Sequence, residues 1–206
     1  MEKLGHDFYD RDTVEVARSL LGKHLVRVWN GIDLVCRITE TEAYVGRIDK
    51  ACHAYDYKRT KRTETLFAPP GTAYLYLIYG MYCCLNFVTE PAGEPSAVLI
   101  RGAEPVSGTD WLARNRFGCP AETLTTQQKK GFLNGPGKLC RALALTREQN
   151  GLDLTGPELF VTPGERGPFE IGVGKRIGID YAEEAADFPW RFWLSSGSGE
   201  VRGGGL

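Results

Sequence analysis

The chain has 206 residues, of which 42% are hydrophobic and 25% charged, a composition typical of globular proteins and not of disordered ones. Its 25 basic and 26 acidic residues argue against a protein that holds nucleic acid by bulk electrostatic attraction alone. The six cysteines lack zinc-site spacing, the first residues lack a signal-peptide pattern, and the longest apolar run, Ala73 to Leu85, is shorter than the about 20 residues of a membrane helix. We therefore expect a reduced, cytoplasmic protein without a membrane span.

The first elements in chain order are a helix and a hairpin. Apolar residues at helical spacing predict a helix over 13–21, with Asp12 or Thr13 as its N-cap and Gly22 after its end. Strand patterns then occupy 24–29 and 34–44. The Asn30-Gly31 dipeptide between them is a strong signal for a tight hairpin.

The rest of the chain is predicted as further strands, two helices and loops. Strands are expected over 72–79, 82–89 and 97–102, strand-like segments over 158–162, 176–179 and 191–194, and helices over 109–116 and 136–145. Asn134 is a possible cap for the second helix, which opens with Pro136. We expect one α+β domain over residues 1–206, a curved, mainly antiparallel sheet with surrounding helices and a protruding hairpin, and a flexible Gly/Ser-rich tail over 195–206.

Two glutamates stand at the end of the second predicted strand. Strict alternation places Glu40, Glu42 and Tyr44 on the same face as the apolar residues that precede them, Leu34, Cys36 and Ile38. A carboxylate beside an apolar face is costly unless it is paired, hydrated or used, and such a setting favours a general base. The alternative is that both glutamates leave the sheet edge and pair with nearby arginines or lysines.

Aromatic residues gather at the second predicted hairpin. Tyr79-Gly80-Met81-Tyr82 fits a two-residue type II′ loop with glycine at the first central position, which would pair Tyr79 with Tyr82. An exposed apolar tip of this kind can act as a wedge between base steps of DNA. The alternative, a tip folded back into the core, is more common among proteins.

Basic residues are concentrated in two stretches despite the neutral average. Residues 47–62 hold six basic and two acidic residues, and 129–141 hold four basic residues and no acidic one. The first stretch belongs to a long polar segment, 47–70, whose length favours a functional loop. We expect both stretches to lie on the face that carries the aromatic tip, giving one-sided binding of DNA.

Ordered motifs along the chain resemble the alkyladenine (3-methyladenine) DNA glycosylase family, which occurs in mammals and many bacteria. The resemblance rests on Arg-Ile-Thr-Glu-Thr-Glu-Ala-Tyr at 37–44, His53, the aromatic run at 70–82 with Asn86, Arg-Gly-Ala-Glu-Pro at 101–105 and Asn-Gly-Pro-Gly-Lys-Leu-Cys at 134–140. The segment from Asn86 to Arg101 is about two residues longer than we expect for that family.

The resemblance implies a monofunctional repair enzyme that flips alkylated or deaminated purines, of the 3-methyladenine, 7-methylguanine and hypoxanthine type, out of duplex DNA and hydrolyses the N-glycosidic bond. Glu42 would be the general base that activates water. The base would be bound by Tyr44, His53, Tyr76, Asn86 and Arg101. Tyr79, with Met81 and Tyr82, would intercalate into the DNA, and phosphates would be bound by Lys58, Arg59, Arg62 and Lys138.

Two other functions compete with this one. A non-catalytic module that binds damaged DNA or structured RNA would explain the aromatic tip but not the carboxylates. A sugar hydrolase with Glu40 and Glu42 as its acid/base pair would leave the tip and the basic loop unexplained. We expect no cofactor and no metal, a monomer, and damaged double-stranded DNA as the partner.

Overall fold

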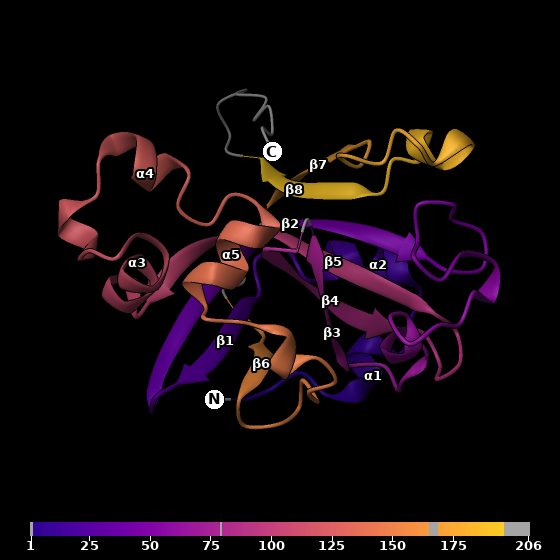
Figure 1. The fold of residues 1–206 in the computed structure, drawn as a ribbon, viewed down its shortest axis with the longest axis horizontal. Coiled ribbons are helices and arrows are strands. Elements are labelled where there is room, and N and C mark those ends of the chain that lie inside the picture. The colour runs from indigo at the N-terminus through magenta and orange to yellow at the C-terminus, as the bar shows by residue number, and fades with distance from the viewer. Residues whose placement is uncertain (1, 79, 165–168, 196–206) are drawn as a thin grey trace.

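The computed structural model describes residues 2–78, 80–164 and 169–195, and within them eight strands form one antiparallel sheet. The strand order is β3-β4-β5-β2-β1-β6, and β8 joins the sheet by pairing with β2 and with β7 (Figure 1). The strands are β1 His24–Trp29, β2 Ile32–Val45, β3 Ala73–Ile78, β4 Tyr82–Thr89, β5 Ser96–Ser107, β6 Leu159–Thr162, β7 Glu170–Gly174 and β8 Arg191–Ser195. The expected α+β architecture is confirmed.

Short helices surround the sheet. They are α1 His6–Tyr9, α2 Thr13–Ser19, α3 Thr109–Phe117, α4 Thr126–Lys130 and α5 Pro136–Ala142, with 3-10 turns at Tyr55–Tyr57, Glu64–Phe67, Ala121–Thr123, Arg147–Gln149 and Glu183–Asp187. The Asp12 side chain accepts the N–H groups of Val14 and Glu15, so it caps α2 as predicted. The α5 helix instead has Gly135 as its N-cap without a side-chain bond, so the expected Asn134 cap is wrong.

The first hairpin forms as the sequence predicts. Trp29 pairs with Ile32, and the two residues between them, Asn30 and Gly31, have positive φ angles of 50° and 75°. Positive φ at both central residues defines the type I′ turn, for which Asn-Gly is the preferred dipeptide.

Strand β2 is the central strand of the sheet and pairs with three other strands. It pairs with β5 along most of its length, with β1 over its first half, and with β8 from Glu40 to Glu42. The main hydrophobic core lies against one face of the sheet and includes Leu34, Cys36 and Ile38 of β2 together with residues of α2, α3 and α5.

Two of the three irregularities in the β2–β5 ladder lie next to Glu40 and change the direction of the side chains that follow. The register runs Ile38–Ala103, Glu40–Gly102, Thr41–Ile100, so Thr39 on β2 and Arg101 on β5 are left without a directly opposing partner. Past this point Ala43 faces the main core, while Tyr44 packs with a second cluster. The prediction that Glu42 and Tyr44 share the face of Leu34, Cys36 and Ile38 is therefore wrong, because the bulge reverses the alternation.

Other predicted elements also differ from the structure. Tyr82 pairs with Ile78 and the Met81 N–H donates to the Ile78 carbonyl, so Gly80 is the second central residue of the turn and the expected Tyr79–Tyr82 pair is wrong. Tyr79 itself lies outside the described residues. Strand β5 extends well beyond 97–102, and the strand predicted at 176–179 is absent there, while β7 lies earlier. Of the tail, only Ser195 is described, as the end of β8.

Candidate active site

A row of side chains crosses four strands on the sheet face opposite the main core. Glu42 on β2 is the register partner of Leu99 on β5, Leu99 pairs with Asn86 on β4, and Asn86 pairs with Tyr74 on β3. Tyr76, two residues along β3, must share the face of Tyr74 because side chains alternate along a strand. Backbone pairing alone thus brings these groups together.

Loops close this row into a cavity of about 350 Å³, within the usual range for small-molecule sites. The long segment after β2 contributes Cys52, His53, Arg62 and Leu66 to its wall, and the segment before the last 3-10 turn contributes 177–179 and Tyr181. The cavity is therefore open enough for a flat aromatic ligand and is lined mainly by aromatic and aliphatic side chains.

Glu42 is the carboxylate of this cavity. Its side chain is fully buried, one oxygen accepts the Tyr44 hydroxyl at 2.8 Å, and the other accepts the Ile177 backbone N–H at 2.9 Å. Burial raises the pKa of Glu42, while Arg101 and the two hydrogen bonds oppose that rise. A carboxylate held in this way is fixed in orientation and disposed to accept a proton.

A second carboxylate, Glu40, lies behind Arg101 and outside the cavity. Its Oε1 accepts hydrogen bonds from Arg101 Nε and from Arg191 Nη1, both at 3.1 Å. The same Arg101 Nε is 3.7 Å from Glu42 Oε1, too far for a hydrogen bond. Glu40 does not line the cavity, so the arrangement does not support an acid/base pair of Glu40 and Glu42 on one substrate.

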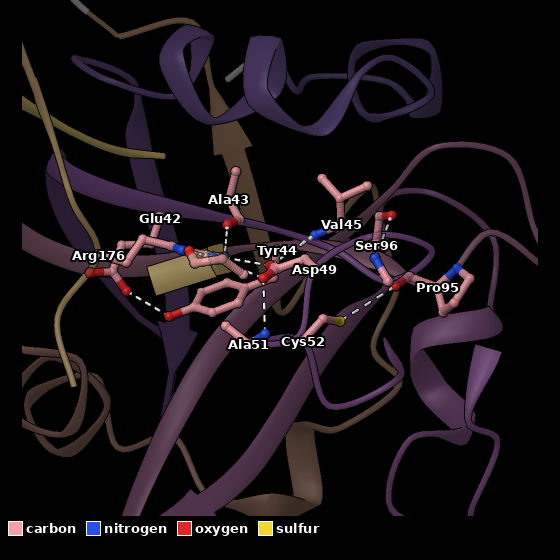
Figure 2. Close-up of polar contacts among 12 residues, drawn as sticks. Glu42, Ala43, Tyr44, Val45, Asp49, Ala51, Cys52, Pro95, Ser96 and Arg176 are labelled. Carbon is pink, nitrogen blue, oxygen red and sulfur yellow. Dashed lines mark hydrogen bonds and ion pairs between the residues drawn. The ribbon is translucent and has the colours of Figure 1, made fainter. Parts of the chain in front are cut away.

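A fully buried ion pair supports the cavity from behind. Arg176 binds both oxygens of Asp49 and also donates to the carbonyls of Ala43 and Ala185. Its guanidinium carbon lies 4.6 Å from the centre of the Tyr44 ring, and Figure 2 shows the hydroxyl of that ring directed at the Glu42 carboxylate. Because Arg176 immediately precedes Ile177, the ion pair holds the backbone amide that binds Glu42.

His53 is neutral in this setting. Its Nδ1 is 3.1 Å from the Tyr74 hydroxyl and its Nε2 is 3.4 Å from Arg62 Nη2. Burial, aided by the positive charge of Arg62, lowers the pKa of His53 to about 4. Since a guanidinium can only donate, Nε2 acts as the acceptor, and Nδ1 carries the proton.

The aromatic rings of the cavity touch one another. The His53 and Tyr76 rings meet edge to face at 4.5 Å, and the Tyr74 and Tyr76 rings are tilted at 5.3 Å. Asn86 donates to the carbonyls of Tyr74 and Cys84, which ties its side chain to the sheet. Together these contacts preorganise an aromatic wall beside Glu42.

The structure brings together every residue to which the family resemblance gives a role in the reaction or in base binding. These residues all line the same cavity and are Glu42, Tyr44, His53, Tyr76, Asn86 and Arg101. Met81 and Tyr82, 72% and 48% exposed, lie at the tip of the β3–β4 hairpin as expected.

The four expected phosphate-binding residues are spread over two elements. Lys58 and Arg59 are exposed on the loop, where Arg59 pairs with Glu64, while Arg62 reaches into the cavity wall. Lys138 lies on α5 directly after Gly137. The backbone of Gly137 packs against the Tyr82 side chain, so Lys138 is close to the hairpin tip.

Sequence reasoning missed part of the wall. Tyr74 could have been found, because it shares a strand face with Tyr76. Ile177 acts through its backbone amide and leaves no side-chain signal. Arg176 and Ile177 lie in the segment 176–179 that was predicted as a strand, and Tyr181 follows that segment.

The described residues hold no group of three or more His, Cys, Asp or Glu side chains able to bind a metal ion. Within the same part of the chain, every helix is too short or too polar to cross a membrane.

Comparison with known proteins identifies the family of the chain. Residues 7–198 match the methylpurine-DNA glycosylase family. A protein of Alkaliphilus oremlandii is 53% identical over 93% of this chain and 95% of its own length, and one of Clostridium perfringens is 52% identical over 93% and 95%. A third, from Desulfitobacterium hafniense, is 50% identical over 94% and 96%, and all three names provisionally identify 3-methyladenine DNA glycosylases. The chain therefore belongs to the methylpurine-DNA glycosylase family and is a hydrolytic DNA glycosylase.

Proposed function

We propose that this glycosylase removes N-alkylated purines, 3-methyladenine foremost, from double-stranded DNA by a water molecule that Glu42 activates. The observation that carries the proposal is the buried Glu42 carboxylate, oriented by Tyr44 and Ile177 at one side of an aromatic cavity. The names of the relatives, which specify 3-methyladenine, support the substrate.

The chemistry follows from the position of Glu42. As the bond between the sugar C1′ and the purine nitrogen breaks, its electron pair leaves with the purine and the sugar becomes oxocarbenium-like. The water oxygen attacks C1′ while Glu42 accepts its proton, and the negative carboxylate stabilises the developing positive charge. An abasic site remains, with the DNA strand uncut.

Selectivity would come from the aromatic wall. The target base has to leave the stack, which costs a few kcal/mol and least at a damaged or mispaired base. An N-alkylated purine is electron-poor and often cationic, so stacking on Tyr76 adds a cation–π contribution of about 0.5–2 kcal/mol over a normal base. Arg176 is fixed against Tyr44 by its fully buried pair with Asp49, whereas the cation near Tyr76, Arg62, sits on an exposed loop, so Tyr76 is the better site for this contribution.

The DNA would approach across the hairpin tip as a duplex bound by a single copy of the chain. Met81 and Tyr82 are exposed there, and we expect Tyr79 to fill the gap that the flipped nucleotide leaves. The phosphates that flank the lesion would be contacted by Lys58, Arg59, Arg62 and Lys138. The dependence of DNA affinity on salt concentration should therefore correspond to only a few phosphate contacts.

A base-release assay tests the proposal. Purified protein is incubated with duplexes that each carry one 3-methyladenine, 7-methylguanine or hypoxanthine, and both the free base and the abasic product are measured. We expect release of 3-methyladenine without strand cleavage. Tight binding to these duplexes with no release of any base over a long incubation would instead favour a damage-binding role.

A further inference from the structure

The Arg62 side chain lies against the aromatic wall of the cavity. Its Nη2 is 3.4 Å from His53 Nε2, and its guanidinium carbon is 5.4 Å from the centre of the Tyr76 ring. The residue sits on an exposed loop, yet its side chain is part of the cavity wall. In the free protein a cation from the chain itself thus rests on the aromatic wall of the base pocket.

Arg59, three residues earlier on the same loop, shows that this placement is not general to the loop. Its guanidinium makes two hydrogen bonds to Glu64, at 2.9 and 2.5 Å, and stacks on Phe67 at 4.7 Å. Arg59 does not line the cavity. The two arginines are similar in charge and exposure, and only Arg62 reaches the site.

The contacts of Arg62 resemble those that the proposed substrate would make. A guanidinium is a flat, delocalised cation with N–H donors at its edge, and it stacks on aromatic faces. An alkylated purine nucleoside is also flat and cationic, and in the proposed binding mode it would stack on Tyr76 and donate from its edge to the same acceptor, His53 Nε2. Like charges at one place repel, so Arg62 and a cationic base exclude each other.

We propose that Arg62 is a displaceable occupant of the base pocket, which gives way to a cationic substrate base and displaces the neutral product base. This inference rests on the proposed function. Hydrolysis leaves the bonding electron pair on the purine, so an N-alkylpurine that enters as a cation is neutral once it is free. The product then loses its cation–π contact with Tyr76, whereas Arg62 keeps its own.

Product inhibition by free 3-methyladenine tests this role. Arg62→Gln should lower the inhibition constant about two- to fivefold, the factor that corresponds to the about 0.5–1 kcal/mol of an exposed cation–π contact. Steady-state turnover should then slow relative to the single-turnover rate, because the base leaves later. Arg59→Gln, the matched control, removes a proposed phosphate contact from the same loop without touching the cavity, so it should weaken DNA binding but leave the inhibition constant of the free base unchanged.

Arg62→Lys separates this role from phosphate binding. Lysine keeps the charge but not the flat, stacking group, so we expect it to behave like Arg62→Gln in product inhibition. If Arg62 served only a phosphate, the lysine variant would match the wild type, and Arg62→Gln would weaken DNA binding with an unchanged inhibition constant. That pattern would overturn the inference, whereas a wild-type protein that releases no base would overturn the proposed function instead.

Discussion

Replacing Asp49 with asparagine tests whether the buried ion pair supports both the fold and the site. Asp49 and Arg176 are fully buried, and Asp49 also accepts the Ala51 N–H at 2.9 Å. Asparagine keeps the shape but leaves the Arg176 charge uncompensated. The two carbonyls that Arg176 also binds, on Ala43 and Ala185, remain available and limit the loss.

The size of the effect follows from that burial. Breaking one partner of a buried ion pair costs about 3–5 kcal/mol. This is a large share of the about 5–15 kcal/mol by which a folded domain is stable. For a chain of this length each kcal/mol lowers the melting temperature by about 2–4 °C, so we expect a decrease of about 6–20 °C. Base release should also fall, because Ile177 next to Arg176 orients Glu42.

Urea unfolding followed by tryptophan fluorescence measures this change. The midpoint should drop while the slope stays constant, since the same surface is exposed on unfolding. Asp187→Asn is the matched control, because its ion pair with Lys175 is exposed on both sides and should contribute little. A loss in Asp49→Asn below about 1 kcal/mol, the range of exposed pairs, would refute the reasoning.

Two further predictions concern ionisable groups. Glu40→Gln should move the acidic limb of the pH–rate profile to lower pH. The negative charge of Glu40 raises the pKa of Glu42, and without that charge Arg101 is free to interact with Glu42 and lower its pKa. The control variant Glu104→Gln should leave the acidic limb in place. His53 has a pKa of about 4 when folded, below its usual 6.5, so the unfolded chain binds the proton first and the free energy of unfolding should fall as pH drops from about 6.5 to about 4. His53→Gln should flatten this part of the stability profile, and parallel profiles for the two proteins would contradict it.

Local signals in the sequence predicted the parts of the fold that depend on nearby residues. The Asn30-Gly31 turn requires two positive φ angles, and the Asp12 cap requires one short acceptor side chain, so each can be read from a few residues. The residues that line the cavity were predicted to bind a base through the resemblance to a family.

The face of the sheet that carries the site could not be predicted from alternation. The strand predicted over 34–44 was expected to alternate without interruption, but in the structure Thr39 and Arg101 break the β2–β5 register and turn Glu42 away from the main core. A bulge arises from the pairing of two strands, so residues 38–42 alone contain no signal that predicts it. The prediction was wrong about the face of the sheet on which Glu42 lies, but it still singled out Glu42 as the candidate carboxylate.

Contacts made by backbone groups, or between segments far apart in the chain, could also not be predicted from the sequence. The Ile177 amide reaches Glu42 across 135 positions of chain, and any residue except proline could supply it. The charge of Arg62 predicts a phosphate contact, whereas its position over the Tyr76 ring depends on how the loop folds over the sheet.

Single-turnover release of 3-methyladenine by Glu42→Gln tests the central claim most directly. Glutamine keeps the shape of the side chain but cannot take a proton from water, so we expect base release to be lost while binding to the lesion duplex is kept. Glu104→Gln, whose wild-type carboxylate pairs with Arg37 outside the base pocket, should release the base at the wild-type rate. Undiminished release by Glu42→Gln would contradict the account, because the water would then be activated by another group.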